Sequence, residues 1–71
     1  MSVKIELRLK QLLSEKDMTQ KSLAEKTGIR ESTISDITRG ARTVMNFEHI
    51  ARIAEALNIE DIRDLILLKK R

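Results

Sequence analysis

Residues 20–39 contain two short apolar patterns separated by a glycine, and this arrangement limits the fold more than any other part of the sequence. Leu23 and Ala24 give the first segment an apolar spot, and Ile34 and Ile37 give the second an apolar stripe at helical spacing. Gly28 lies between them and can end a helix in the left-handed region without a Cβ penalty. We therefore predict a helix, a tight turn and a second helix over about 31–39, crossing at a steep angle. The apolar positions of this unit are Leu23, Ala24, Ile29, Ile34 and Ile37.

The composition favours a small helical domain. Proline is absent, glycine occurs twice, and Phe47 is the only aromatic residue among 71. Such a chain is poorly suited to a β-rich fold, whereas its leucine, isoleucine and alanine suit the core of a compact helical bundle. Seventy-one residues correspond to a single domain, residues 1–71. Because the sequence has no cysteine, it can form neither a disulfide nor a thiolate metal site, and we expect no cofactor.

Three further helices are predicted from apolar periodicity outside the central pair. The first runs from about residue 2 or 3 to 16, and the last covers about 60–69. Thr19 and Asn46 are expected to cap the second and fourth helices. Residues 69–71 then form a basic tail. The core positions expected on these helices are Ile5, Leu9, Leu12, Leu13, Phe47, Ile50, Ile53, Ala54, Leu57, Ile62, Leu65 and Ile66.

The charges are divided unevenly along the chain. Residues 19–43 contain five basic and three acidic residues, whereas residues 46–64 contain two basic and five acidic ones. The excess of positive charge therefore coincides with the predicted helix pair. Such a distribution would suit a DNA-binding protein, because phosphate neutralisation supplies most of the non-specific affinity for nucleic acid. Because the asymmetry is mild, we expect modest affinity per subunit.

Several blocks of the sequence resemble a known family. The runs 23–29, 32–35 and 39–40 look like the helix-turn-helix of lambda-repressor-like (Cro/repressor, XRE-type) regulators, and the run 50–59 resembles their fourth helix. The resemblance covers nearly the whole chain. It implies an all-α, five-helix DNA-binding domain whose second and third helices form the helix-turn-helix. It also implies sequence-specific binding to double-stranded DNA as a repressor, with the helix at about 31–39 in the major groove.

The resemblance also assigns candidate site residues. Arginine suits guanine, carboxylates can accept a hydrogen bond from cytosine N4, and serine is permissive. By position, the base-reading residues are Arg30, Glu31, Ser32 and Asp36. By the same resemblance, the phosphate-contacting residues are Thr19, Gln20, Arg39, Arg42 and Thr43.

Some of these residues also have a purely structural interpretation. Glu31 can be a first-turn carboxylate favoured by the helix dipole, and Asp36 can pair with Arg39 on the helix surface. Arg30 stands where the family often has serine, so the cap of the recognition helix is either lost or shifted to Ser32. Both interpretations remain open on the sequence.

The predicted last helix has more apolar residues than its core face requires. Leu67 and Leu68 form this surplus, and we hypothesise a two-fold dimer whose interface contains Leu65, Leu67 and Leu68. A frayed terminus resting on the core is the alternative. The acidic surface of the last two helices, together with the same leucines, also suits a different class of function. In that interpretation the domain is an antitoxin-like or adaptor module that binds a protein partner.

No catalytic constellation is visible in the sequence. It has no phosphate-cradling glycine loop, and His49 is its only histidine, without a second ligand at metal spacing. We therefore expect neither an enzyme nor a metal site. The longest apolar run, residues 65–68, is too short to span a membrane, and no signal-peptide pattern occurs. We therefore expect a cytoplasmic protein.

Overall fold

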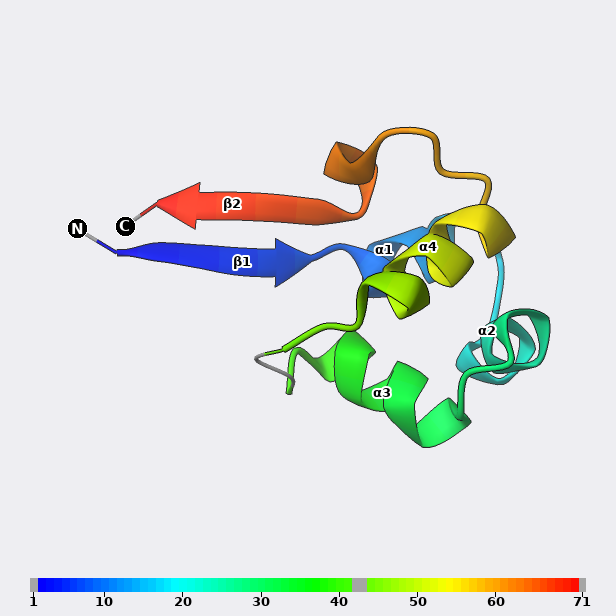
Figure 1. The fold of residues 1–71 in the computed structure, drawn as a ribbon. Coiled ribbons are helices and arrows are strands. Elements are labelled where there is room, and N and C mark those ends of the chain that lie inside the picture. Colours follow the sequence, from blue (N-terminus) through cyan, green and yellow to red (C-terminus); the bar gives the residue numbers. More distant parts are fainter. Residues whose placement is uncertain (1, 42–43, 71) are drawn as a thin grey trace.

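The computed structural model describes residues 2–41 and 44–70, which form a helical body with a two-stranded ribbon at one end (Figure 1). The ribbon consists of the two ends of the chain and projects away from the helices, which gives the molecule extents of 39 × 22 × 21 Å. In chain order, the elements are β1 (Val3–Leu7), α1 (Leu9–Glu15), α2 (Gln20–Thr27), α3 (Glu31–Arg39), α4 (Phe47–Ala56), the short 3-10 helix η1 (Ile62–Asp64) and β2 (Ile66–Lys70).

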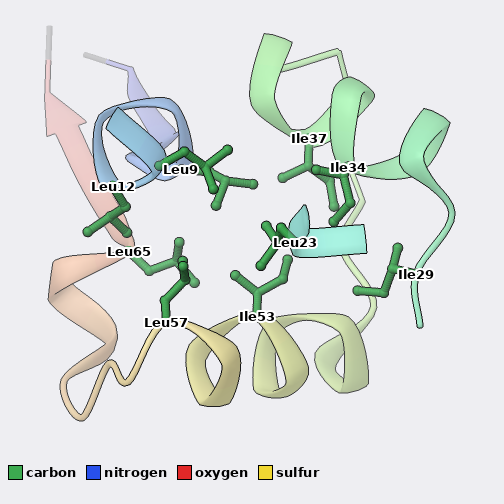
Figure 2. Packing of buried hydrophobic residues seen from close by; sticks show 10 residues of the cluster. Leu9, Leu12, Leu23, Ile29, Ile34, Ile37, Ile53, Leu57 and Leu65 are labelled. Atoms are coloured by element: carbon green, nitrogen blue, oxygen red, sulfur yellow. The ribbon is translucent and has the colours of Figure 1, made fainter. Parts of the chain in front are cut away.

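The core lies where the four helices meet the segment that precedes β2. Figure 2 shows buried side chains from each helix, and Leu65 from that segment, converging on one cluster. Burying a leucine or isoleucine side chain contributes about 1.5–3 kcal/mol, so this cluster provides the main stabilisation of a chain of this size. Its members are Leu9, Leu12, Leu13, Leu23, Ile29, Ile34, Ile37, Ile53, Leu57 and Leu65.

The central helices agree with the sequence prediction. The helix expected over about 31–39 is observed as α3, Glu31–Arg39. The hydroxyl oxygen of Thr19 caps α2 by accepting from the Ser22 amide at 3.0 Å. The side chain of Asn46 caps α4 by accepting from the Glu48 amide at 2.8 Å. These caps explain where both helices begin, because each satisfies a backbone N–H that has no partner inside its helix.

The predicted first helix is wrong over its N-terminal half. Residues Val3–Leu7 form strand β1, and α1 begins only at Leu9. Ile5, expected in the core, leaves 59% of its surface exposed. The segment alternates apolar and charged residues, a period of two that fits a strand better than a helix.

The predicted fifth helix is also wrong, and with it the all-α, five-helix class. Residues 60–69 contain the single turn η1 followed by β2, which pairs antiparallel with β1 from Val3↔Lys70 to Leu7↔Ile66. The domain is therefore a helical helix-turn-helix fold with a small two-stranded sheet. Ile62, expected in the core of the fifth helix, is 60% exposed on η1.

The expected basic tail is partly a strand. Lys69 and Lys70 belong to β2, and the Lys69 Nζ lies 3.5 Å from the Glu6 Oε2 on β1. Arg71, the last residue of that tail, lies outside the described residues. The ribbon therefore gives one of the three basic residues an acidic neighbour on the opposite strand.

The expected core position Phe47 is 86% exposed. It is the first residue of α4, whereas the fully buried positions begin later, at Ile53 and Leu57. The first turn of α4 therefore extends beyond the core. The apolar spacing correctly predicted a helix here. It could not show where along the helix the core ends, because that depends on how the helices pack together.

Candidate nucleic-acid interface

The turn between α2 and α3 is built around Gly28. Its φ is +74°, and its N–H donates to the Ala24 carbonyl at 2.9 Å, which ends α2. A Cβ at this position would meet nothing nearer than the Arg52 Nη1 at 3.9 Å. Glycine is therefore required by the backbone conformation and not by a lack of space. The next residue, Ile29, is buried and fills the corner as predicted.

Thr27 fixes the same turn from the inside and was not predicted as a site residue. Its buried hydroxyl donates to the Leu23 carbonyl at 2.8 Å, and its oxygen accepts from the Ile29 amide at 3.2 Å. One side chain therefore joins the last turn of α2 to the residue that follows the glycine. A threonine directly before a helix-ending glycine was the available signal, because its hydroxyl can bond the carbonyl four residues earlier.

α4 supports this turn from a third direction. The Arg52 Nη1 donates to the Thr27 carbonyl at 3.4 Å, and the Arg52 Nη2 lies 2.6 Å from the Glu48 Oε1. The carbonyl would otherwise lack a helical partner, because it lies at the C-terminal end of α2. This arginine was also not singled out from the sequence. Its role depends on how α4 approaches α2, which local spacing does not reveal.

One side of α3 is anchored and the other is free. Ile34 and Ile37 are 0% and 2% exposed and point into the core (Figure 2). Arg30, Glu31 and Ser32, at the N-terminal end of the helix, are all exposed. Arg30 occupies the N-cap position without a side-chain cap, so the cap is lost and not shifted to Ser32. The helix therefore presents three adjacent polar side chains on a rigidly held backbone.

The remaining polar residues of α3 are less free. Asp36 is half-buried, and its Oδ1 pairs with the Arg39 guanidinium one turn later. The pairing of Asp36 with Arg39 on the helix surface, which was one of the two interpretations of Asp36, is thus observed. Glu31 stands in the first turn, where a negative charge is favoured by the helix dipole. Both acidic side chains still lie on the same helix as Arg30 and Ser32.

The candidate phosphate-contacting residues lie at separate places. Thr19 is exposed, but its hydroxyl oxygen is already used in the α2 cap. Gln20, the first residue of α2, is half-buried. Arg39 ends α3 and holds Asp36, as described above. Arg42 and Thr43 lie outside the described residues.

Comparison with protein families shows to which family the chain belongs. A family model described as a Cro/C1-type helix-turn-helix DNA-binding domain matches residues 8–70. The chain belongs to this Cro/C1-type family. Comparisons with curated proteins and with solved structures find no match. Membership of the family supports the function of a DNA-binding regulator.

The Cro/C1-type match includes the whole helix-turn-helix and β2 but begins after β1, at Arg8. The candidate base-reading residues all fall inside the matched range. The first strand of the ribbon falls outside it. The family match therefore accounts for the α2–α3 unit and not for β1.

The candidate dimer residues of this Cro/C1-type domain differ widely in how much of each is exposed. Leu65 is 2% exposed and belongs to the core of its own chain, Leu67 is half-buried, and Leu68 is 66% exposed. The region expected to carry them as a helix consists of η1 and β2, with Leu65 between the two and Leu67 and Leu68 on the strand. Of the three leucines, Leu68 alone has most of its side chain available to another molecule.

Within residues 2–41 and 44–70, no group of three histidine, cysteine, aspartate or glutamate residues could hold a metal ion. His49, the only histidine, is half-buried on α4. None of the helices in these ranges is long and apolar enough to cross a membrane.

Proposed function

We propose that the protein is a sequence-specific regulator of double-stranded DNA that acts as a repressor by placing α3 in the major groove. The proposal depends mainly on one observation. The N-terminal end of α3 presents Arg30, Glu31 and Ser32 to solvent, while Ile34 and Ile37 lock the opposite side. The N-terminal residues of such a helix are those that reach base edges in helix-turn-helix complexes. We do not assign an enzymatic activity to this arrangement.

The side chains at this end suggest how bases are read. The Arg30 guanidinium can donate twice to guanine O6 and N7, and the Glu31 carboxylate can accept from cytosine N4. The Ser32 hydroxyl can both donate and accept a hydrogen bond, so it suits either kind of base edge. Because Arg39 neutralises Asp36, phosphate repulsion by that carboxylate is reduced. A mixed acidic and basic reading surface favours specificity over affinity, since non-specific attraction comes from positive charge alone.

We also propose repression and dimerisation, both of which are compatible with α3 lying in the major groove. A domain bound in the groove of a promoter excludes other proteins from that DNA, and this requires no activating surface. A two-fold dimer would place two α3 helices about one DNA turn apart, roughly 34 Å, on a near-palindromic site. We therefore include homodimerisation in the proposed function.

A selection of binding sites from random duplex DNA, at a stated salt concentration, tests the proposal. We expect enrichment of a near-palindromic sequence. On that site, Arg30→Ala should weaken binding by about 1–3 kcal/mol, roughly 5–150-fold, and relax the preference at one base position. Fluorescence anisotropy measures both effects.

Arg63→Ala provides the matched control. It also removes one exposed arginine, from η1, which lies on the opposite side of the molecule from α3 (Figure 1). Its affinity for the selected site should be close to that of the wild type. Failure to enrich any sequence, or equal losses in the two variants, would refute sequence-specific reading by α3.

One observation favours a second candidate function, an antitoxin-like or adaptor module. Val44 and Phe47, near the start of α4, are 78% and 86% exposed, and large apolar side chains at a surface are suited to a protein partner. Phe47→Ala separates the two proposals. It should leave DNA binding intact if the protein is a regulator, and it should abolish a partner complex if the protein is an adaptor.

A further inference from the structure

The two-stranded ribbon has an apolar face that the helical body covers only in part. In the register of β1 and β2, Val3, Ile5 and Leu7 lie on the same face as Leu68 and Ile66, and Lys70 lies on it at the end of the ribbon, opposite Val3. The exposed fractions of Val3, Ile5 and Leu68 are 56%, 59% and 66%. An isolated two-stranded ribbon is at best marginally stable in water and needs either further strands or packing against a helix. Leu7 and Ile66 pack against the core, but the outer part of the ribbon, with Val3, Ile5 and Leu68, has neither kind of support.

The outer edge of β1 has unpaired backbone groups. The Arg8 N–H donates to the Leu65 carbonyl at 2.8 Å, which continues the register of the β1–β2 pair. Because hydrogen-bonded positions alternate in an antiparallel pair, Lys4 and Glu6 direct their backbone groups toward β2. Val3, Ile5 and Leu7 therefore direct theirs toward the opposite edge. The sheet contains only these two strands within residues 2–41 and 44–70, so that edge is open.

We propose that the β1 edge pairs antiparallel with β1 of a second copy of this chain, with the two-fold axis at Ile5. The result is a four-stranded sheet in which the two β1 strands are central. Ile5 faces its own counterpart, and Val3 faces the partner's Leu7. The apolar face then becomes continuous across both chains. This inference supplies the surface for the dimer that the proposed function includes.

Charge complementarity on the other face selects both the occupant and the register. Centred on Ile5, Lys4 lies opposite the partner's Glu6, and Glu6 lies opposite the partner's Lys4. Moving the axis by one residue would place two Lys4 or two Glu6 side chains opposite one another, which is unfavourable. Glu6 already lies 3.5 Å from Lys69 of its own chain, so each carboxylate would stand between two ammonium groups. Exposed pairs add little affinity, but they determine register.

The edge of β2 is a poorer surface for the same contact. A two-fold axis at Leu68 would place Lys69 opposite the partner's Leu67 and Lys70 opposite the partner's Ile66. Lysines on an edge strand are a common means of preventing strand addition. The two strands of the ribbon therefore differ, with β1 suited to pairing and β2 protected against it.

Sedimentation equilibrium of the full chain without DNA tests the proposal. Lys4→Glu and Glu6→Lys should each weaken dimerisation by at least about fivefold, because each change places like charges opposite one another twice. An equimolar mixture of the two variants should restore a dimer. In the mixed pair, one chain has acidic side chains at positions 4 and 6, and the other has basic side chains at both. Restoration on mixing would not occur if the substitutions only disturbed folding.

A backbone variant tests the same edge independently of charge. Ile5→Pro removes an N–H that faces the open edge and leaves the ladder with β2 intact, as proline can on an edge strand. It should abolish the dimer, whereas Ile5→Ala, the control for loss of the side chain, should only weaken it. Circular dichroism melts establish that each variant is folded.

Two results would overturn the inference. One is a wild-type chain that remains monomeric throughout the micromolar range. The other is a dimer that persists unchanged in Lys4→Glu, Glu6→Lys and Ile5→Pro. Because no DNA is present, these outcomes are independent of the binding-site selection, so failure of the ribbon contact is distinguishable from failure of DNA binding.

Discussion

The α2–α3 corner and the β1–β2 ribbon differ in how completely each is enclosed by its own chain. In the corner, Leu23 and Ile34 are fully buried, and the turn is fixed by a glycine and a buried hydroxyl. In the ribbon, Ile5 and Leu68 face each other across the strands with more than half of each side chain exposed. The corner is therefore complete within one chain, and the ribbon is not.

In the function that we propose, this difference separates two tasks within 71 residues. A helix that reads bases must be held rigidly, because a small misplacement removes its contacts, and burial on one side provides that rigidity. A surface that binds a second copy must instead remain accessible until the copy arrives. The interior stabilises the corner, while we infer that association stabilises the ribbon. Substitutions at the two places should therefore have different consequences.

The largest expected difference is between Leu23→Ala and Leu68→Ala. Both remove the same atoms, but Leu23 is fully buried at the centre of the core and Leu68 is 66% exposed on β2. Leu23→Ala should lower the free energy of unfolding by about 2–5 kcal/mol, since it leaves a cavity. Leu68→Ala should change the stability of the monomer by less than about 0.5 kcal/mol.

Urea denaturation at low protein concentration measures both values for the monomer. Repeating it at high concentration sharpens the comparison, because dimerisation adds to apparent stability by mass action. The Leu68→Ala deficit should then increase, and the Leu23→Ala deficit should not. Equal deficits at low concentration would mean that the ribbon is as much a part of the core as the corner is.

The corner could be predicted from the sequence because its determinants are local. Gly28 indicates the turn, and the spacing of Ile34 and Ile37 indicates the buried side of α3. The exposure of Arg30, Glu31 and Ser32 then follows from helical geometry alone. The candidate base-reading residues at the start of α3 can therefore be identified from the sequence once the helix itself has been predicted.

The ribbon could not be predicted in the same way because its two strands are far apart in sequence. Val3 pairs with Lys70, and no local pattern in either segment specifies the other. Ile5 and Leu9 are also four residues apart, so a helical interpretation accounted for the same apolar residues. The role of Arg52 was missed for a related reason, since it depends on how α4 approaches the turn.

Two threonines make the same hydrogen bond in different surroundings, and replacing them should affect stability to different extents. Thr27 and Thr38 each donate to the carbonyl four residues earlier, at 2.8 and 2.7 Å. The Thr27 oxygen also accepts from the Ile29 amide, and Thr27 is buried. Thr27→Val should therefore cost about 1–3 kcal/mol, because it leaves that buried N–H without a partner.

Thr38→Val is the matched control on α3. Its hydroxyl only donates, in a half-buried position, and the carbonyl that it contacts already accepts a helical bond. Chemical denaturation should find a change close to zero. If Thr38→Val were as destabilising as Thr27→Val, the donated bond would be the important one, and the proposed double role of Thr27 in the turn would be wrong.

The smallest expected effect lies at the segment that leads into β2, where a side-chain oxygen again accepts a backbone N–H. The Asp61 carboxylate accepts from the Arg63 amide at 2.9 Å and lies 2.8 Å from the Arg63 Nη2. The side chain of Arg63, and then its backbone N–H, hold the pKa of Asp61 below its ordinary value. Arg63→Ala should raise this pKa, but not fully, since the backbone bond remains. A carbon-detected NMR titration of the Asp61 carboxyl measures the change.

The sign of the pH dependence follows from the lowered pKa. A carboxyl group whose pKa falls on folding stabilises the native state above its unfolded pKa, and the contribution is lost as the pH falls through the folded value. Asp61 is partly exposed, so solvent screening keeps this contribution small. Denaturation should therefore not resolve Arg63→Ala from the wild type at neutral pH, in contrast to Thr27→Val. A large loss of stability in Arg63→Ala would show that this segment is as firmly integrated as the corner, which would remove the basis for treating the ribbon as separately stabilised.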